Sequence, residues 1–433
     1  MKHRFLLLAA PTLAVSLLAA GPDARACGGC VVPPDTSTQV TGHRMIFAVS
    51  KTQTTLYDQI EYAGDPESFA WFLPIKGQVD VGLSSDAIFA YLGDVSQPVV
   101  LPPQITCVTS SRNGGLASVA EDSGGSDGVY VPAEEEVNVI SSEVVGPYET
   151  VQLEATSPGA LVEWLTSHGY GVPADVEPVI AAYQQEGFGF LAMKLVPGEG
   201  VTSMRPVRVT SPGGGLSLPL RMVAAGTGAI TPVTLQVVGE GRYEIAGRPN
   251  LRVFDGQIVW DWDAGISNYR VLRDEVVDGS DGFGWLTESA NPLSKQALID
   301  QVTQTIQFSP GTTGWGDPDA GTSELDDALL DLETLFAGMD EQSIWLTRMY
   351  ARLTRPALAE DLVLGAAADQ KEVNRFLQAY VWTGTPPQCP PSNLFLSCAI
   401  RPPNRDFDSA FVLGIGLVAG LSWSLRRRRA RPD

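Results

Sequence analysis

Residues 59–77, QIEYAGDPESFAWFLPIKG, constrain the fold more than any other stretch of the chain. Apolar and polar residues alternate up to a Gly-Asp-Pro break, and a second apolar run then carries Phe69, Trp71 and Phe72. This pattern predicts two strands joined by a tight turn. Three large aromatic side chains within four residues also require a hydrophobic core on at least one face of the second strand.

Alternation, helical spacing and turn residues predict further elements along the chain. Strands are expected at residues 44–50, 54–62, 69–75, 136–155 with a turn at Gly146 and Pro147, 189–195, 204–210, 215–222, 233–238 and 251–255. Helices are expected at residues 87–92 after the cap 84–86, 158–168 after Ser157, 173–187, 293–306, 323–336 and 343–353.

The order of these elements predicts an α+β fold, with the helices packed on one side of a mostly antiparallel sheet. Residues 27–290 form the β-rich part, and residues 291–385 are expected to be more helical. Paired prolines then mark a stalk at residues 386–408.

Several separate blocks carry a family resemblance. They are residues 26–30 (ACGGC), 59–77, 145–151 (VGPYETV), 164–165, 168–170, 172–173, 192–195 (AMKL) and 218–221 (LPLR). With these blocks in this order, the chain resembles the bacterial family called domain of unknown function 2330 over residues 27–364. The resemblance implies an envelope location and an architecture, but no activity.

The first 26 residues have the pattern of a secretory signal. Lys2 and Arg4 precede an apolar stretch, and a small-x-small site ends at Ala26. Cleavage there would make Cys27 the first residue. A lipoprotein signal, with lipidation of Cys27, is the alternative interpretation.

Residues 409–425 contain no charged side chain, and Arg426, Arg427, Arg428 and Arg429 follow at once. Seventeen residues reach the lower limit for a membrane-spanning helix. Because positive charge stays on the cytoplasmic side, the bulk of the chain is expected outside. The arrangement resembles the tripartite C-terminal sorting signals of Gram-negative bacteria. A buried core helix is the alternative, which the arginine cluster disfavours.

The chain carries a net charge of −21 although its tail is basic, so the part between the termini is strongly acidic. Such a surface repels nucleic acid and anionic lipid. It leaves a cation or a basic protein as the expected partner of the acidic surface, unless the acidity only keeps the protein soluble.

Five cysteines are present: Cys27, Cys30, Cys107, Cys389 and Cys398. Export permits disulfides, and the last two, flanked by prolines, would close a small loop in the stalk. The Cys-Gly-Gly-Cys spacing is that of a thiol–disulfide exchange motif, but no helix signal follows it to lower a thiol pKa. A structural disulfide, within this pair or to Cys107, is therefore the favoured interpretation.

No other motif indicates catalysis or a cofactor. The sequence lacks a Gly-x-Ser-x-Gly elbow, a His-Glu-x-x-His zinc motif and a phosphate loop. Only His43 and His168 remain after the leader, and His168 is expected to cap a helix. Asp317, Asp319 and Glu324 offer calcium ligands without the EF-hand spacing, and helix capping is the simpler role for this loop.

Two functional hypotheses remain. In the first, the protein is a non-enzymatic, membrane-anchored envelope protein that acts by binding or by structure. In the second, it is an envelope enzyme, either a thiol oxidoreductase that uses Cys27 and Cys30 or a hydrolase with an unrecognised site.

Overall fold

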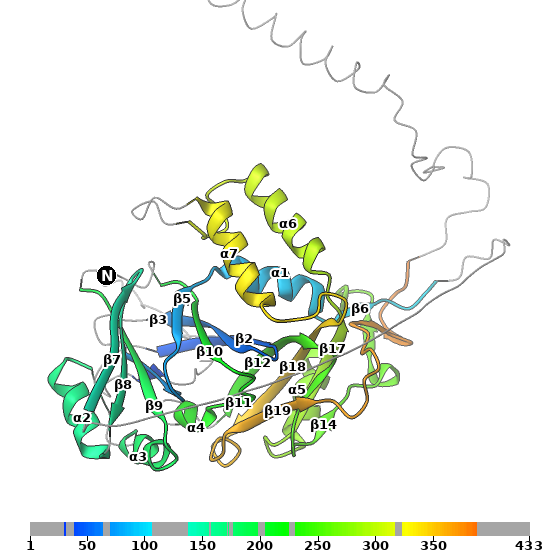
Figure 1. Ribbon diagram of the computed structural model, residues 1–433. Coiled ribbons are helices and arrows are strands. Elements are labelled where there is room, and N and C mark those ends of the chain that lie inside the picture. Colours follow the sequence, from blue (N-terminus) through cyan, green and yellow to red (C-terminus); the bar gives the residue numbers. More distant parts are fainter. Residues whose placement is uncertain are drawn as a thin grey trace, which may run out of the picture. The chain divides into compact units, whose positions relative to one another are not determined.

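The computed structural model describes residues 30–31, 39–63, 70–105, 137–155, 157–170, 172, 176–197, 204–224, 230–316 and 323–387. One compact unit comprises residues 1–104 and 112–385 and contains every helix and strand among the described residues. The fold is α+β and rich in sheet (Figure 1), as the sequence predicts.

An eight-stranded sheet forms the centre of this unit. Its strand order is β14 (Asn250–Leu251), β17 (Trp285–Pro292), β18 (Ile344–Thr354), β12 (Ile230–Glu240), β2 (Gln39–Val49), β3 (Gln53–Ala63), β10 (Val207–Pro212) and β5 (Asp80–Leu83). All neighbours are antiparallel except β12 beside β2 and β14 beside β17.

A five-stranded antiparallel sheet packs against one face of the larger sheet. Its order is β1 (Cys30–Val31), β4 (Ala70–Ile75), β9 (Gly189–Leu195), β8 (Tyr148–Ala155) and β7 (Val137–Val145). Strands β7 and β8 form the hairpin expected at residues 136–155, and Gly146 supplies the positive φ of its turn.

Period-two alternation in both sheets builds four layers. Leu56 and Leu73 come from different sheets and share the core between them. Tyr57 points to the opposite face, where α1 (Asp86–Ser96), α6 (Lys295–Phe308) and α7 (Glu324–Phe336) cover the large sheet. Phe72 points to the outer face of the small sheet, beneath α2 (Pro158–Ser167) and α3 (Glu177–Gln185). Helices α2 and α3 therefore lie on one side of the small antiparallel sheet, as expected, whereas α1, α6 and α7 cover the outer face of the large sheet.

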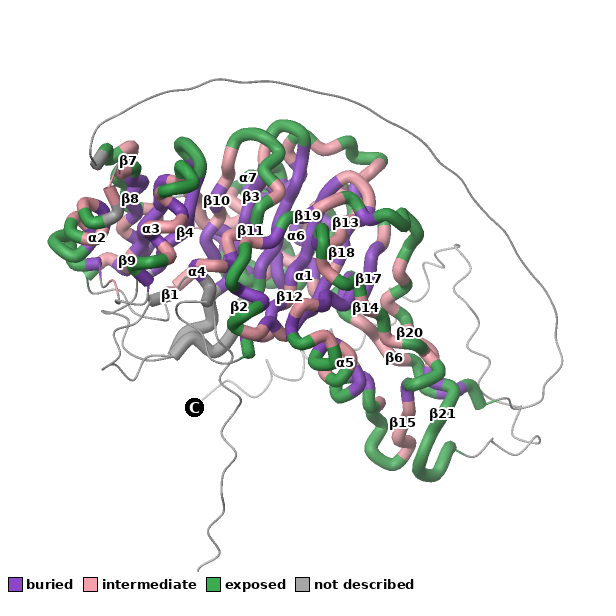
Figure 2. Tube along the Cα trace, turned by 90° about the horizontal axis from the view of Figure 1, so that it is seen from below, coloured by how far each residue is buried: buried purple, intermediate pink, exposed green. Residues whose placement is uncertain are grey.

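Smaller elements complete the unit. They are α4 (Leu220–Ala224), α5 (Tyr269–Asp278), the sheet of β11 (Ser217–Leu218), β19 (Leu362–Ala366) and β13 (Tyr243–Ile245), the sheet of β16 (Ile266–Ser267), β15 (Val259–Asp261) and β21 (Val381–Thr383), and the pair β20 (Phe376–Gln378) and β6 (Val99–Leu101). Figure 2 shows buried residues concentrated in the two large sheets, whereas β21 is exposed.

Helix starts follow the predicted caps closely. The side chains of Ser85, Ser157 and Ser323 each accept a hydrogen bond from a backbone N–H in the first turn of α1, α2 and α7. His168 is the C-cap of α2, as expected. Helix α1 continues past Gly93 to Ser96, beyond its predicted end.

Four predictions of elements are wrong. The strand expected at residues 251–255 ends at Leu251, and a 3₁₀ turn occupies Asp255–Gln257. Strands β3 and β4, expected as a hairpin, do not pair with each other, because they belong to different sheets. Residues 343–353 form strand β18 and not a helix. The strand expected at residues 215–222 ends at Leu218, since Pro219 interrupts it and α4 follows.

The terminal predictions lie outside the described residues. These are the signal sequence at residues 1–26, most of the stalk, the membrane span at residues 409–425 and the cluster Arg426–Arg429. Among the described helices, none has the length and apolar character that crossing a membrane requires. The expected division of the chain at residue 290 stays a prediction.

Candidate functional site: a pocket between the two large sheets

The floor of a pocket is set by the register of three neighbouring strands. Phe47 of β2 pairs with Leu56 of β3, which pairs with Val209 of β10. Paired residues point to the same face of a sheet, so these three side chains form one apolar row. We call them the apolar row. It faces the five-stranded sheet and continues into the core between the two sheets.

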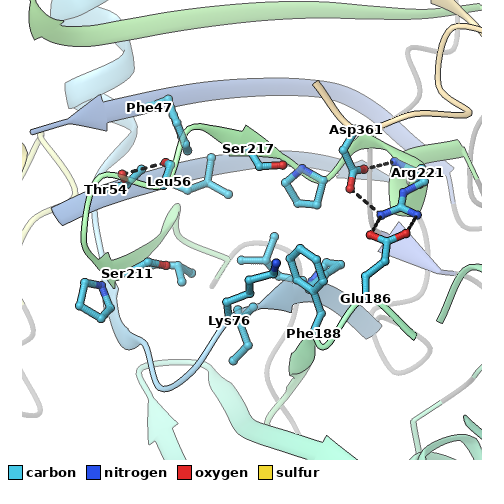
Figure 3. Close-up of a pocket in the computed structure, with 17 residues that line it drawn as sticks. Phe47, Thr54, Leu56, Lys76, Glu186, Phe188, Ser211, Ser217, Arg221 and Asp361 are labelled. Atoms are coloured by element: carbon cyan, nitrogen blue, oxygen red, sulfur yellow. Dashed lines mark hydrogen bonds and ion pairs between the residues drawn. The ribbon is translucent and has the colours of Figure 1, made fainter. Parts of the chain in front are cut away.

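The opposite wall comes from β4 and from the segment that follows α3. Leu73 and Ile75 point from β4 toward the large sheet, and Phe188 lies beside Lys76 (Figure 3). The space between the walls measures about 460 Å³. Its lining residues are Phe47, Thr54, Leu56, Leu73, Pro74, Ile75, Lys76, Glu186, Phe188, Val209, Ser211, Pro212, Gly215, Ser217, Pro219, Arg221 and Asp361.

Thr54 and Ser211 form a polar pair one row away from the apolar row. They are direct partners across β3 and β10. The Thr54 hydroxyl donates to the Gly215 carbonyl oxygen at 2.9 Å, which ties β3 to the segment before β11. This edge of the pocket therefore carries hydroxyl groups, whereas its floor is apolar.

At the other side, Arg221 of α4 joins three separate segments. Its Nη1 and Nη2 donate to the two oxygens of Glu186, after α3, at 2.6 and 2.7 Å. Nη2 also donates to Asp361, before β19, at 2.8 Å. The Tyr183 hydroxyl donates to the same Asp361 carboxylate at 2.5 Å, and the Arg221 guanidinium lies 4.1 Å from the Tyr183 ring centre.

Two acidic groups, Glu186 and Tyr183, have shifted pKa values in the cluster that they form with Arg221 and Asp361. The hydrogen bonds from Arg221 lower the pKa of the Glu186 carboxyl. Burial and the Asp361 carboxylate raise the pKa of the Tyr183 phenol well above its usual range. The Glu186 carboxyl is therefore ionised and the Tyr183 phenol is neutral at neutral pH.

Lys76 directly follows β4 at the mouth of the pocket and is exposed. Its Nζ lies 4.4 Å from the centre of the Phe188 ring, a cation–π geometry. Among the residues that the structure describes, none forms an ion pair with Lys76. Its charge also contributes to the lowered pKa of the Glu186 carboxyl.

A smaller cavity of about 20 Å³ adjoins the pocket and shares Leu56, Leu73 and Pro219 with it. Asp58 and Trp71 line this cavity, and the Trp71 side chain hydrogen-bonds to the Asp58 carboxyl. Asp58 is only 3% exposed, and burial raises the pKa of its carboxyl well above the usual range. The inner end therefore presents a carboxyl group, whose ionisation burial disfavours, to a space large enough for one water molecule.

Of the predicted site residues, only Cys30 and Glu324 lie within the described residues. Cys30 belongs to β1 and pairs with Trp71 of β4. Cys27, Cys107, Cys389 and Cys398 lie outside, as do Asp317 and Asp319, so the disulfides and the calcium site stay predictions.

Glu324 has a structural role in the described part of the chain. Its carboxylate accepts hydrogen bonds from the Gly311 and Thr313 backbone N–H groups at 2.6 and 3.1 Å and from the Thr313 hydroxyl. These donors lower the pKa of the carboxyl despite partial burial. Within the described residues, no group of three or more histidine, cysteine or acidic side chains is arranged to hold a metal ion.

The pocket itself is not predicted from the sequence. Its residues come from strands that are distant in the chain, and no motif marks them. Two of the blocks that carry the family resemblance nevertheless contribute to its lining: residues 59–77 supply the wall from Leu73 to Lys76, and residues 218–221 supply Pro219 and Arg221. The alternation in residues 59–77 was the available signal, because it assigns Leu73 and Ile75 to one face.

Comparison with known proteins identifies a family and no activity. The model of the family described as "Uncharacterized protein conserved in bacteria (DUF2330)" matches residues 21–357. No curated protein and no solved structure matches the chain.

Proposed function

The chain belongs to this bacterial family of uncharacterized proteins, and we propose that it is an exported, membrane-anchored envelope protein that binds a small, mainly apolar ligand between its two large sheets. The observation that carries this proposal is the pocket of about 460 Å³ above the apolar row. Its volume lies within the ~300–1,000 Å³ that is typical of small-molecule sites.

The distribution of lining residues favours binding of an apolar ligand with one polar end. Leu56, Leu73 and Ile75 offer an apolar surface already shielded from water. Charged groups lie at Lys76 and in the cluster around Arg221. A mainly apolar cavity with a few convergent polar groups is the usual form of a ligand site.

A fluorescence titration tests the site. N-phenyl-1-naphthylamine, an uncharged apolar probe, brightens when it leaves water, and we expect saturable binding to the full chain. Ser217→Trp, which fills the pocket, should weaken binding at least tenfold. Ser167→Trp is the matched control on the exposed end of α2 and should leave binding unchanged.

Two outcomes would contradict the proposed site: no saturable binding by the wild type, or equal binding by Ser217→Trp and the wild type. Ser211→Trp fills the same pocket from β10 and replaces Ser217→Trp if that variant does not fold. Unfolding midpoints of the variants show whether each one is folded.

The envelope location is supported by the apolar leader and by the uncharged segment before Arg426–Arg429. Protease added to intact spheroplasts should digest the chain down to a short protected C-terminal fragment. Full protection of residues 27–408, with digestion only after lysis, would place the protein inside the cell and contradict the proposal.

A further inference from the structure

We propose that the ligand of this pocket is a single-chain amphiphile with an anionic head, whose head pairs with Lys76 and whose chain lies on the apolar row. This inference rests on the proposed function and specifies the chemical class of the ligand. It follows from which charged groups of the lining are already occupied and which one is not.

Both carboxylates of the lining are already hydrogen-bonded within the protein. Both Glu186 oxygens accept from the Arg221 guanidinium. One Asp361 oxygen accepts from the Tyr183 hydroxyl and the Arg221 backbone N–H, and the other accepts from the Arg221 guanidinium. All four carboxylate oxygens therefore already have donors, so they have less hydrogen-bonding capacity left for a cationic head.

Both terminal nitrogens of Arg221 donate to carboxylates, whereas its Nε is buried without a hydrogen-bond partner among the described residues. Lys76 differs, since its ammonium lies over the face of Phe188 and forms no ion pair among the described residues, although its charge acts on Glu186. An ammonium has three donors and no acceptor, so an anion is the group that it recognises. The ammonium of Lys76 thus favours an anionic head at this position over a cationic one.

The positions of head and chain follow from the geometry. Lys76 is exposed at the pocket mouth, directly after Leu73 and Ile75 of the inner wall. A head held there directs an attached chain inward, over the apolar row. The volume of about 460 Å³ lies in the lower half of the range for small-molecule sites, which suits one chain better than a branched or polycyclic ligand.

Carboxylate and phosphate heads share this chemistry, and a displacement assay distinguishes them. Bound N-phenyl-1-naphthylamine is displaced from the full chain by dodecanoate, dodecyl phosphate, dodecanol or dodecyltrimethylammonium, each below its critical micelle concentration. We expect both anions to displace the probe at lower concentrations than dodecanol, and the cation to be the weakest competitor. The ratio of the concentrations at which dodecanoate and dodecyl phosphate displace the probe shows whether the ligand is closer to a fatty acid or to a phosphorylated lipid.

Lys76→Met removes the charge and keeps the apolar stem. It should weaken dodecanoate about tenfold, as expected for the loss of one charge-assisted hydrogen bond, and leave dodecanol unchanged. Lys371→Met, at an exposed lysine outside the pocket, is the matched control and should behave as the wild type.

The inference is overturned if the wild type binds dodecanoate no better than dodecanol, if Lys76→Met affects both equally, or if the cation competes best. Each of these results requires a bound probe and leaves the proposed pocket intact. Failure of the pocket itself is recognised separately, by the absence of probe binding or by the insensitivity of that binding to Ser217→Trp.

Discussion

Trp71 and Asp58 illustrate how single residues define the space between the sheets. Trp71 is 2% exposed and lies in the core between the two sheets, as its aromatic run predicts. Its indole bonds to a carboxyl group that the sequence does not distinguish from a surface acid. Alternation places Asp58 on the same face as Leu56, but only the second sheet, packed on that face, buries it.

Trp71→Ala should lower the free energy of unfolding by ~3–5 kcal/mol, because it removes a large buried side chain and leaves a cavity. Trp382→Ala, at a tryptophan that is 51% exposed, should change it by less than about 0.5 kcal/mol. Chemical denaturation of both variants checks the difference. Equal effects would mean that Trp71 does not pack between the sheets.

Asp58→Asn should change the pH dependence of stability. The buried carboxyl has a raised pKa, so its contribution is complete below the unfolded pKa of about 3.9 and is lost as the pH rises through its folded pKa. The unfolding free energy of Asp58→Asn should therefore rise relative to that of the wild type as the pH increases above about 4. A constant difference over this range, measured by urea titrations, would contradict a raised pKa.

At the scale of elements, the sequence correctly predicts those features that depend on interactions between neighbouring residues. Serine caps give the starts of α1, α2 and α7, because the capping hydrogen bond lies within four residues. Local signals fail for β18, because residues 343–353 (SIWLTRMYARL) contain good helix formers. Eleven pairings with β12 and further pairings with β17 override that preference. These partners lie far away in the chain and leave no mark on the segment itself.

Besides its apolar packing, helix α7 is joined to the large sheet by a buried carboxylate. Asp331 is 2% exposed and accepts from Arg208 of β10 at 2.9 Å, from the Trp315 indole at 3.0 Å and from the Ser84 hydroxyl. Three segments therefore depend on this single side chain. The helical spacing of Asp331 in the sequence predicts only that it faces inward.

Asp331→Ala should destabilise the protein by ~3–5 kcal/mol, since it leaves the Arg208 guanidinium without its partner in a mostly buried site. Glu333→Ala, two residues away on the exposed side of α7, should be nearly neutral. Thermal and urea unfolding compare the two variants. A neutral Asp331→Ala would show that α7 is held by its apolar residues alone.

At the scale of the whole molecule, the α+β class follows from the order of the elements, but the four layers do not. Residues 59–77 predict two strands correctly, yet not that the first belongs to the large sheet and the second to the small one. The pocket exists because of that separation: Leu56 and Leu73 face each other from different sheets. Such a site depends on sheet-to-sheet packing, which local sequence patterns do not specify.

The most direct test of the pocket is to locate a bound apolar molecule by photo-crosslinking. Dodecanol carrying a diazirine in mid-chain is bound to the full protein, irradiated, and mapped by mass spectrometry with unlabelled dodecanol as competitor. We predict competable labels near Leu56, Leu73 and Val209, on three strands that meet only in the folded protein. Labels confined to the exposed apolar side chains around Trp382, with none on β3, β4 or β10, would contradict binding between the sheets.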